Sequence, residues 1–275
     1  MRDEPLLNEL RLKADKLRCL AIEAIYQAQS GHPGASLSLA DIIAVLYFHE
    51  LSVDPHFPAN PDRDRVVLSK GHAAPIWYAA LAEAGFFPKE ELFRLRKIDS
   101  LLQGHPCNTV PGVDLTTGSL GLGLSGAVGM AIGGKRRKSP ARVYAILGDG
   151  EQGEGQIWEA AMAAAHFKLD NLMAITDRNL YQNDGPTSEV MGLEPLAEKW
   201  RAFGWYIIEA DGHNIAALLA AFALARETRG RPTMLLAHTI KGKGAAYLIN
   251  RPELHYTPPT REQRDAVLAQ LGGLK

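Results

Sequence analysis

The spacing of apolar residues predicts two helices in the first fifty residues of this 275-residue chain. Near the N-terminus apolar positions recur every three or four residues, which predicts an amphipathic helix from about 8 to 29. The run Ser30-Gly31-His32-Pro33-Gly34 interrupts this pattern. Ser38 and Asp41 then form the pattern of a capping box, which predicts a second helix that continues through Leu51.

Farther along the chain, apolar runs of strand length alternate with helical stretches. Strands are predicted at 66–68, 143–147, 172–176, 205–210 and 233–239. Helices are predicted from near Gly121 and at 156–167, 193–203, 215–227 and 261–271. This alternation predicts an α/β fold with a mainly parallel sheet and helices on both faces. Since no repeat or linker interrupts the pattern, we expect one domain over 1–275.

Composition and charge narrow the classes of function. A hydrophobic content of 46% with 26 glycines is typical of a globular protein. A formal charge of −1 gives no reason to expect nucleic acid, and the basic run 135–138 is expected to be a solvated loop. No signal peptide or long apolar run suggests a membrane. Two cysteines, Cys19 and Cys107, suit a reducing compartment, so we expect a cytoplasmic protein.

The run Gly148-Asp149-Gly150 is the most informative chemical feature. It follows a predicted strand, and Asn179 lies 29 positions after Gly150, near the end of the next strand. Ligands of parallel sheets bind at the carboxyl ends of the strands. A carboxylate and an amide oxygen at that edge would suit a hard divalent cation carrying a diphosphate. Gly-Asp-Gly alone is more often a turn, but the flanking strands favour the metal interpretation.

A glycine-rich segment and four histidines are further candidates. A helix that starts near Gly121, within the segment 116–126, would direct free N–H groups at an anion, although such starts also serve helix packing alone. The segment is neither a P-loop nor a Rossmann fingerprint. Four histidines lie in Gly- or Pro-flanked loops, where sites are usually built: His32, His72, His105 and His255. A zinc site is the alternative, but neither their spacing nor a Cys pair supports it.

The order and spacing of these motifs resemble the transketolase family over nearly the whole chain. The Gly-Asp-Gly to Asn spacing is similar to the thiamin diphosphate motif. Further matching runs are 30–35, 62–65, 69–72, 104–106, 116–121, 184–185, 211–213, 241–244 and His255. The resemblance implies the thiamin-diphosphate-binding fold, with thiamin diphosphate and Mg²⁺ (or Ca²⁺ or Mn²⁺) as cofactors. Transfer of a two-carbon ketol unit from a ketose phosphate to an aldose phosphate is the implied reaction. His32 with the run 104–106 favours transketolases over deoxyxylulose-phosphate synthases.

The resemblance also implies roles for individual residues. The metal would be held by Asp149, Asn179 and the backbone carbonyl of Tyr181. Cofactor contacts would come from His72, Ser119, Leu120, Gly121, Asp149, Gly150, Asn179 and His255. The catalytic set would be His32, His105 and His255, which contact the sugar, together with Glu154. In the family Glu154 matches a glutamate that links paired active sites; a carboxylate favoured by a helix N-terminus is the alternative.

Transketolases that consist of one polypeptide continue well beyond this length, and their later domains hold the aminopyrimidine ring. The resemblance therefore implies the N-terminal subunit of a split transketolase. Its partner would be a C-terminal subunit that supplies the aminopyrimidine-binding domain, with two copies of each subunit and with no nucleic acid or membrane partner.

Two positions depart from the family pattern. Tyr256 follows His255, where glycine is usual, and Arg178 stands in the metal loop, where a small polar or uncharged residue is commoner. Tyr256 therefore leaves open another split thiamin diphosphate enzyme with a non-standard sugar or a 2-oxo acid as donor. A non-catalytic binding protein is disfavoured, because Asp149, Asn179 and His32 are all present.

Overall fold

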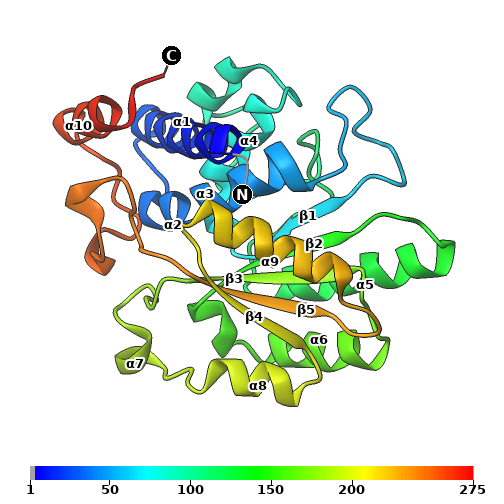
Figure 1. Ribbon diagram of the computed structural model, residues 1–275. Helices are drawn as coiled ribbons and strands as arrows, with labels where there is room; N and C mark the ends of the chain where they lie inside the picture. The colour runs from blue at the N-terminus through cyan, green and yellow to red at the C-terminus, as the bar shows by residue number, and fades with distance from the viewer. Residues whose placement is uncertain (1–3, 275) are drawn as a thin grey trace.

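The protein is built on one parallel sheet, shown in Figure 1, a computed structural model that describes residues 4–274. The strand order is β1-β2-β3-β5-β4. The strands are β1 (Arg65–Leu68), β2 (Val143–Gly148), β3 (Leu172–Arg178), β4 (Tyr206–Asp211) and β5 (Thr233–His238). Each predicted strand is present, with ends displaced by no more than two residues. β2 and β3 are buried along their whole length, which explains why they are continuous apolar runs rather than alternating ones.

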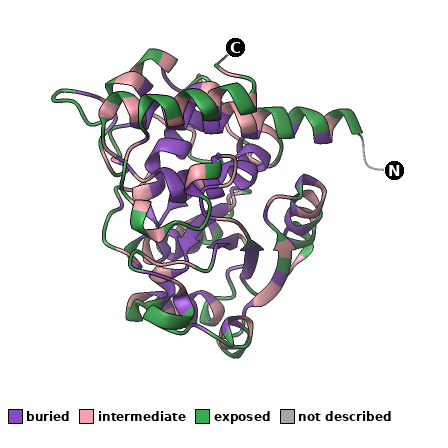
Figure 2. Ribbon diagram, turned by 90° about the vertical axis from the view of Figure 1, so that its left-hand side faces the viewer, coloured by how far each residue is buried: buried purple, intermediate pink, exposed green. Residues whose placement is uncertain are grey.

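Helices cover both faces of this sheet (Figure 1). One face carries α1 (Glu4–Ala28), α3 (Ala40–Val45), α4 (Ala74–Glu83) and α9 (Ile215–Glu227). The opposite face carries α5 (Leu122–Arg137), α6 (Gly155–His166) and α8 (Leu196–Ala202). Strand β1 shows the division, since Val66 and Leu68 pack in the first cluster and Val67 in the second. The predicted α/β architecture is confirmed, and Figure 2 shows the buried interior between exposed helix surfaces.

Shorter elements connect these layers. They are α2 (Pro33–Ser38), a π-helical turn η1 (Leu46–Glu50), the 3₁₀ turns η2 (Gly71–Ala73), η3 (Lys89–Arg94), η4 (Gly150–Gly153), η5 (Ala246–Leu248) and η6 (Pro252–Leu254), with α7 (Thr187–Val190) and α10 (Arg261–Leu271). α10 ends where it was predicted and begins with a capping box formed by Thr260 and Gln263. Over residues 4–274, no helix combines the length and the apolar character needed to cross a membrane.

The predicted capping box at Ser38 and Asp41 is wrong. The Ser38 hydroxyl donates to Asp177 at 2.6 Å, and Asp41 accepts from Arg18 and His213. These tertiary contacts replace the local capping bonds. The expected second helix is α3 followed by η1, and a further short helix, α2, ends at Ser38.

Other helix predictions differ at their ends. α1 begins at Glu4, four residues before the predicted start, and α8 begins at Leu196 rather than at Leu193. Helix α4 was not predicted. Every residue from 74 to 82 is buried, so this helix lacks the polar face on which a helical period depends.

Candidate cofactor site

The site lies where strands β2 and β3 end side by side. Gly148, the last residue of β2, is in register with Asp177 of β3. Asp149 directly follows the end of β2, and Asn179 directly follows the end of β3. The adjacent strand ends therefore bring these two side chains to one edge of the sheet, as the sequence predicts.

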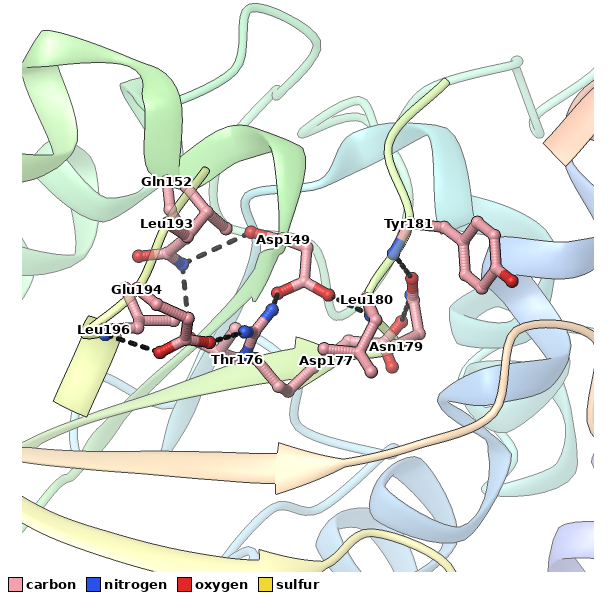
Figure 3. A network of polar contacts seen from close by, with 12 residues as sticks. Asp149, Gln152, Thr176, Asp177, Asn179, Leu180, Tyr181, Leu193, Glu194 and Leu196 are labelled. Carbon is pink, nitrogen blue, oxygen red and sulfur yellow. Dashed lines mark hydrogen bonds and ion pairs between the residues drawn. The ribbon is translucent and has the colours of Figure 1, made fainter. Parts of the chain in front are cut away.

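The Asp149 carboxylate is buried and held at both oxygens (Figure 3). It is only 2% exposed. Its Oδ1 accepts from Nη1 of Arg178 at 2.8 Å, and its Oδ2 accepts from the backbone N–H of Leu180 at 2.5 Å. Burial raises the pKa of Asp149 to about 6, although the Arg178 charge opposes this shift. A bound cation would favour the ionised form of this carboxyl group.

Asn179 and Tyr181 form a tight turn beside this carboxylate (Figure 3). The Asn179 amide oxygen accepts from the backbone N–H of Tyr181 at 3.1 Å, and its amide nitrogen donates to Asp177 at 3.2 Å. The second contact orients the amide, because it places the nitrogen toward Asp177 and leaves the oxygen on the Tyr181 side. An acidic oxygen, an amide oxygen and a nearby backbone carbonyl are the donor types that Mg²⁺ prefers.

A cavity of about 270 Å³ opens beside these residues. Eight residues predicted for the site line it: His32, His72, Leu120, Asp149, Gly150, Asn179, Tyr181 and His255. Four others do not line it: His105, Ser119, Gly121 and Glu154. His105 is exposed but lies close by, since a Cβ on Gly118, a lining residue, would be 3.8 Å from its ring. Glu154 is exposed at the start of α6 and makes no capping hydrogen bond.

Three histidines form a triangle over the cavity. The ring centroid of His32 lies 5.1 Å from that of His72 and 5.1 Å from that of His255. The centroids of His72 and His255 are 5.4 Å apart. Burial and then Arg96 lower the pKa of His32 to about 4. Burial and then Lys241 lower the pKa of His255 to about 3, and burial also lowers that of His72. All three rings are therefore neutral at pH 7, which suits hydrogen bonds to hydroxyl and carbonyl groups.

The depressed pKa of His32 predicts a loss of stability in acid. Between pH 6.5 and about 4 the unfolded chain binds a proton at this position and the folded protein does not, so the free energy of unfolding falls as pH falls. We expect His32→Gln to lose less stability than the unmodified protein between pH 7 and 5, measured by urea unfolding. The raised pKa of Asp149 acts in the opposite direction but is common to both proteins. Equal losses would contradict the prediction, and the exposed His166, changed to Gln, is the control.

Glu151, which sequence reasoning missed, holds the glycine-rich turn against the sheet. This buried carboxylate accepts from the backbone N–H groups of Gly121 at 2.8 Å and Gly148 at 3.0 Å, and from the Ser69 hydroxyl. Gly121 adopts a left-handed conformation (φ 86°) immediately before α5, where a glycine is favoured. Glu151 thus joins the end of β2 to the start of α5. Its position inside the Gly-Asp-Gly-Glu run was the available signal.

Two lysines, to which sequence reasoning gave no role, add positive charge to the cavity. Lys70 is 2% exposed and its Nζ donates to Asp177 at 2.5 Å. Lys241 donates to the carbonyl of Gln182 at 3.3 Å, and burial, followed by Lys70, lowers its pKa to about 8. Both line the cavity. The sequence signal was their place next to glycines in the runs 69–72 and 241–244.

Within the described range, 4–274, no group of three or more His, Cys, Asp or Glu side chains is arranged to hold a metal ion. The donor set predicted at Asp149 is of a different kind, because it would combine one carboxylate with an amide and a carbonyl oxygen. The histidine triangle, with ring centroids 5.1–5.4 Å apart, is likewise not arranged as a metal site among the described residues.

Fold and site together define an α/β protein with a cavity at the carboxyl edge of a parallel sheet, where such folds bind their ligands. Residues 10–273 match the family described as transketolase, thiamine diphosphate binding domain. The chain belongs to the transketolase family and contains its thiamin-diphosphate-binding domain. The predicted family and cofactor class are confirmed.

Relatives fall into two groups by length. The chain is 46% identical over 264 residues to 6-deoxy-6-sulfo-D-fructose transketolase subunit SqwG of Clostridium sp. (strain MSTE9), with 96% of each chain covered. It is 42% identical to an apulose-4-phosphate transketolase subunit of Phocaeicola vulgatus, covering 96% of this chain and 94% of that one. Transketolase from Leishmania mexicana superposes with a TM-score of 0.91 at 32% identity, covering 96% of this chain but 41% of that one. The chain thus spans nearly all of the two subunits and less than half of that transketolase.

Proposed function

We propose that this chain is the N-terminal, diphosphate-binding subunit of a two-subunit transketolase that acts with thiamin diphosphate and Mg²⁺. The single observation that carries the proposal is the cavity at the sheet edge. One cavity is lined by the metal donors Asp149 and Asn179, the cations Lys70 and Lys241, and the histidine triangle. Near-complete coverage of two relatives named as transketolase subunits supports the two-subunit part.

The residues fit the implied cofactor. Asp149 is a buried carboxylate with oxygen sites left for a cation, and a carboxylate accepts up to about four hydrogen bonds or metal contacts. Lys241 supplies positive charge for a diphosphate, and Lys70, whose own charge is balanced by Asp177, lines the same cavity. Nδ1 of His255 is buried without a hydrogen-bond partner, which is costly unless a ligand satisfies it.

Each part of the cavity has a distinct task in the proposed reaction. Asp149, Asn179 and the Tyr181 carbonyl hold the Mg²⁺, while Leu120, Gly150 and the turn at Ser119 and Gly121 approach the cofactor. Bound thiamin diphosphate supplies the stabilisation of negative charge that carbon–carbon bond cleavage needs. The neutral rings of His32 and His255 hold sugar hydroxyl and carbonyl groups and move protons at those oxygens. His72 contacts the cofactor, and His105 contacts the sugar from the exposed rim.

The same proposal covers the partner subunit, the substrates and the cellular location. The partner is a C-terminal subunit with the aminopyrimidine-binding domain, present with this chain in two copies each, and the substrates are sugar phosphates in the pentose phosphate range. Residues 1–275 act as a single diphosphate-binding domain in the cytoplasm. The exposed Glu154 links paired active sites across the interface.

For the substrate that donates the two-carbon unit, there is a specific second candidate. Relatives that the chain covers almost completely are named for 6-deoxy-6-sulfo-D-fructose and apulose 4-phosphate, which are non-standard sugars. Tyr256 is 66% exposed and does not line the cavity, so its side chain leaves the volume beside His255 open. A non-standard ketose donor is therefore the second candidate, ahead of a 2-oxo acid.

Ketol transfer is expected only when this chain is combined with its partner. We expect no turnover by the chain alone, because in this proposal the partner supplies the ring-binding domain. The measurement is aldose-to-ketose conversion by the purified chain and by its complex with a co-purifying candidate partner. Xylulose 5-phosphate, 6-deoxy-6-sulfo-D-fructose and pyruvate serve as parallel donors, each with and without thiamin diphosphate and Mg²⁺.

The outcomes separate the parts of the proposal. Transfer by the isolated chain would show that the two-subunit interpretation is wrong. Transfer from pyruvate alone would replace the ketose donor by a 2-oxo acid. Activity of the complex that survives complete removal of thiamin diphosphate would overturn the function itself.

A further inference from the structure

Arg178 joins the proposed metal site to the loop that precedes α8. It is the last residue of β3 and is 5% exposed. One of its guanidinium nitrogens, Nη1, holds Oδ1 of Asp149 at 2.8 Å, and the other, Nη2, holds Oε1 of Glu194. A guanidinium presents its donors in a rigid planar fork, so a single side chain fixes both carboxylates at once.

The Glu194 end of this bridge is anchored to α8. Oε2 of Glu194 accepts from the backbone N–H of Leu196, the first residue of that helix, at 2.9 Å (Figure 3). Arg178 and Glu194 also line a second cavity, of about 700 Å³, together with residues 179–181 of the metal loop. The Asp149 carboxylate is therefore connected through Arg178 and Glu194 to an element that is not part of the cofactor cavity.

The contacts of Arg178 with Asp149 and Glu194 can affect the affinity for a cation in two ways, which have opposite signs. Arg178, Asp149 and Glu194 together carry a net charge of −1; without Arg178 the two carboxylates carry −2. On electrostatics alone, loss of Arg178 would tighten cation binding. If the bridge instead orients the metal ligand, its loss would weaken binding, since removal of a residue that orients a ligand typically costs about 10–100-fold in metal affinity.

Orientation is the stronger effect in this geometry. Asp149 is 2% exposed, so bulk water has little access to it, and of its two protein partners only the Leu180 N–H would still hold the group. We infer that Arg178 is a positioning residue of the metal site, which holds the Asp149 carboxylate in place by tying it to Glu194 and α8. This inference rests on the proposed function, since it takes Asp149 as a metal ligand.

The test is the affinity for Mn²⁺ of the chain combined with its partner, in the presence of thiamin diphosphate. Free Mn²⁺ is measured by its electron paramagnetic resonance signal. We expect Arg178→Met to raise the Kd for Mn²⁺ by about 10–100-fold. Arg178→Lys should give partial rescue, because an ammonium group keeps the charge but cannot hold two carboxylates in a fork. Arg201→Met is the matched control, since this half-exposed arginine of α8 pairs with Glu198 away from the site. Far-ultraviolet circular dichroism confirms that each variant is folded.

Glu194→Ala keeps the inference testable if Arg178→Met does not fold. The Glu194 side chain is 69% exposed, so the fold should tolerate its loss, and Kd should rise at the lower end of the same range, about tenfold. Unchanged or tighter Mn²⁺ binding by the folded Arg178 variant, or by Glu194→Ala when that variant does not fold, would overturn the positioning role and leave the proposed function standing. Absence of Mn²⁺ binding by the unmodified chain, combined with its partner and thiamin diphosphate, would overturn both.

Discussion

Replacing Asp149 by alanine is expected to abolish Mg²⁺-dependent binding of thiamin diphosphate while the chain stays folded. Asp149 is the one carboxylate in the proposed donor set, and Mg²⁺ depends on a charged oxygen ligand. The variant should fold for two reasons. Arg178 keeps Glu194 as a partner. The raised pKa of Asp149 also shows that burial of its charge is unfavourable, so alanine removes a buried charge. The loss in affinity should exceed the roughly 10–100-fold that a residue outside the metal ligands contributes.

Calorimetric titration with thiamin diphosphate at fixed Mg²⁺ measures this effect, and circular dichroism checks the fold. Asp170→Ala is a control, since this carboxylate pairs with Lys135 and accepts from Gly230 far from the cavity. Turnover retained by the Asp149 variant, when combined with the partner chain, would show that the metal site has been assigned to the wrong residue.

Asp177→Asn is expected to destabilise the protein by about 3–5 kcal/mol, the usual cost of removing one partner of a buried ion pair. Asp177 is fully buried and pairs with Lys70, which is itself 2% exposed. Burial acts to raise the pKa of Asp177, but Lys70 and the hydroxyl donors Ser38 and Thr239 outweigh it and hold the pKa below its usual value. Asparagine keeps the shape but leaves the Lys70 charge buried without its anion.

Urea unfolding measures the change, with Asp265→Asn on the exposed side of α10 as the control. The double variant Lys70→Met with Asp177→Asn should recover part of the loss, because it leaves no unpaired buried charge. If the single Asp177 variant were as stable as the unmodified protein, or if the double variant were no more stable than the single one, the ion pair would not be the cause.

Much of the fold was predictable because, in most elements, the pattern of apolar residues matches which side chains the fold buries. The central strands of a parallel sheet are buried on both faces, so β2 and β3 are unbroken apolar runs that can be found without a structure. Helix α9 was predicted at both ends because its buried residues recur at helical spacing. Helix α4 was not predicted, because it is enclosed and has no polar face to mark its period.

The failed capping box shows where local reasoning stops. Ser38 and Asp41 have the right types and spacing for a local bond, but Asp177 and His213 offer stronger partners from 139 and 172 residues away. A side chain can form hydrogen bonds with any group that the fold brings within a few ångströms. Sequence spacing reveals only those partners that are close along the chain.

In the candidate site, too, some features were predictable from the sequence and others were not. The Gly-Asp-Gly run and Asn179, each at a strand end, were predicted to meet, because adjacent parallel strands end at a common edge and this follows from chain order alone. That three histidines at positions 32, 72 and 255 lie with ring centroids within 5.4 Å was not deducible from their spacing. The same holds for Lys70 and Asp177, 107 residues apart.

By itself, the sequence determined the class of fold, the family and the type of cofactor, since periodicity and short motifs act over neighbouring residues. Only the tertiary structure decided which charges are paired, which side chains line one cavity, and that Arg178 holds Asp149 and Glu194 together. The physical reason is that hydrogen bonds and ion pairs act over a few ångströms in space. Folding sets those distances, and separation along the chain does not.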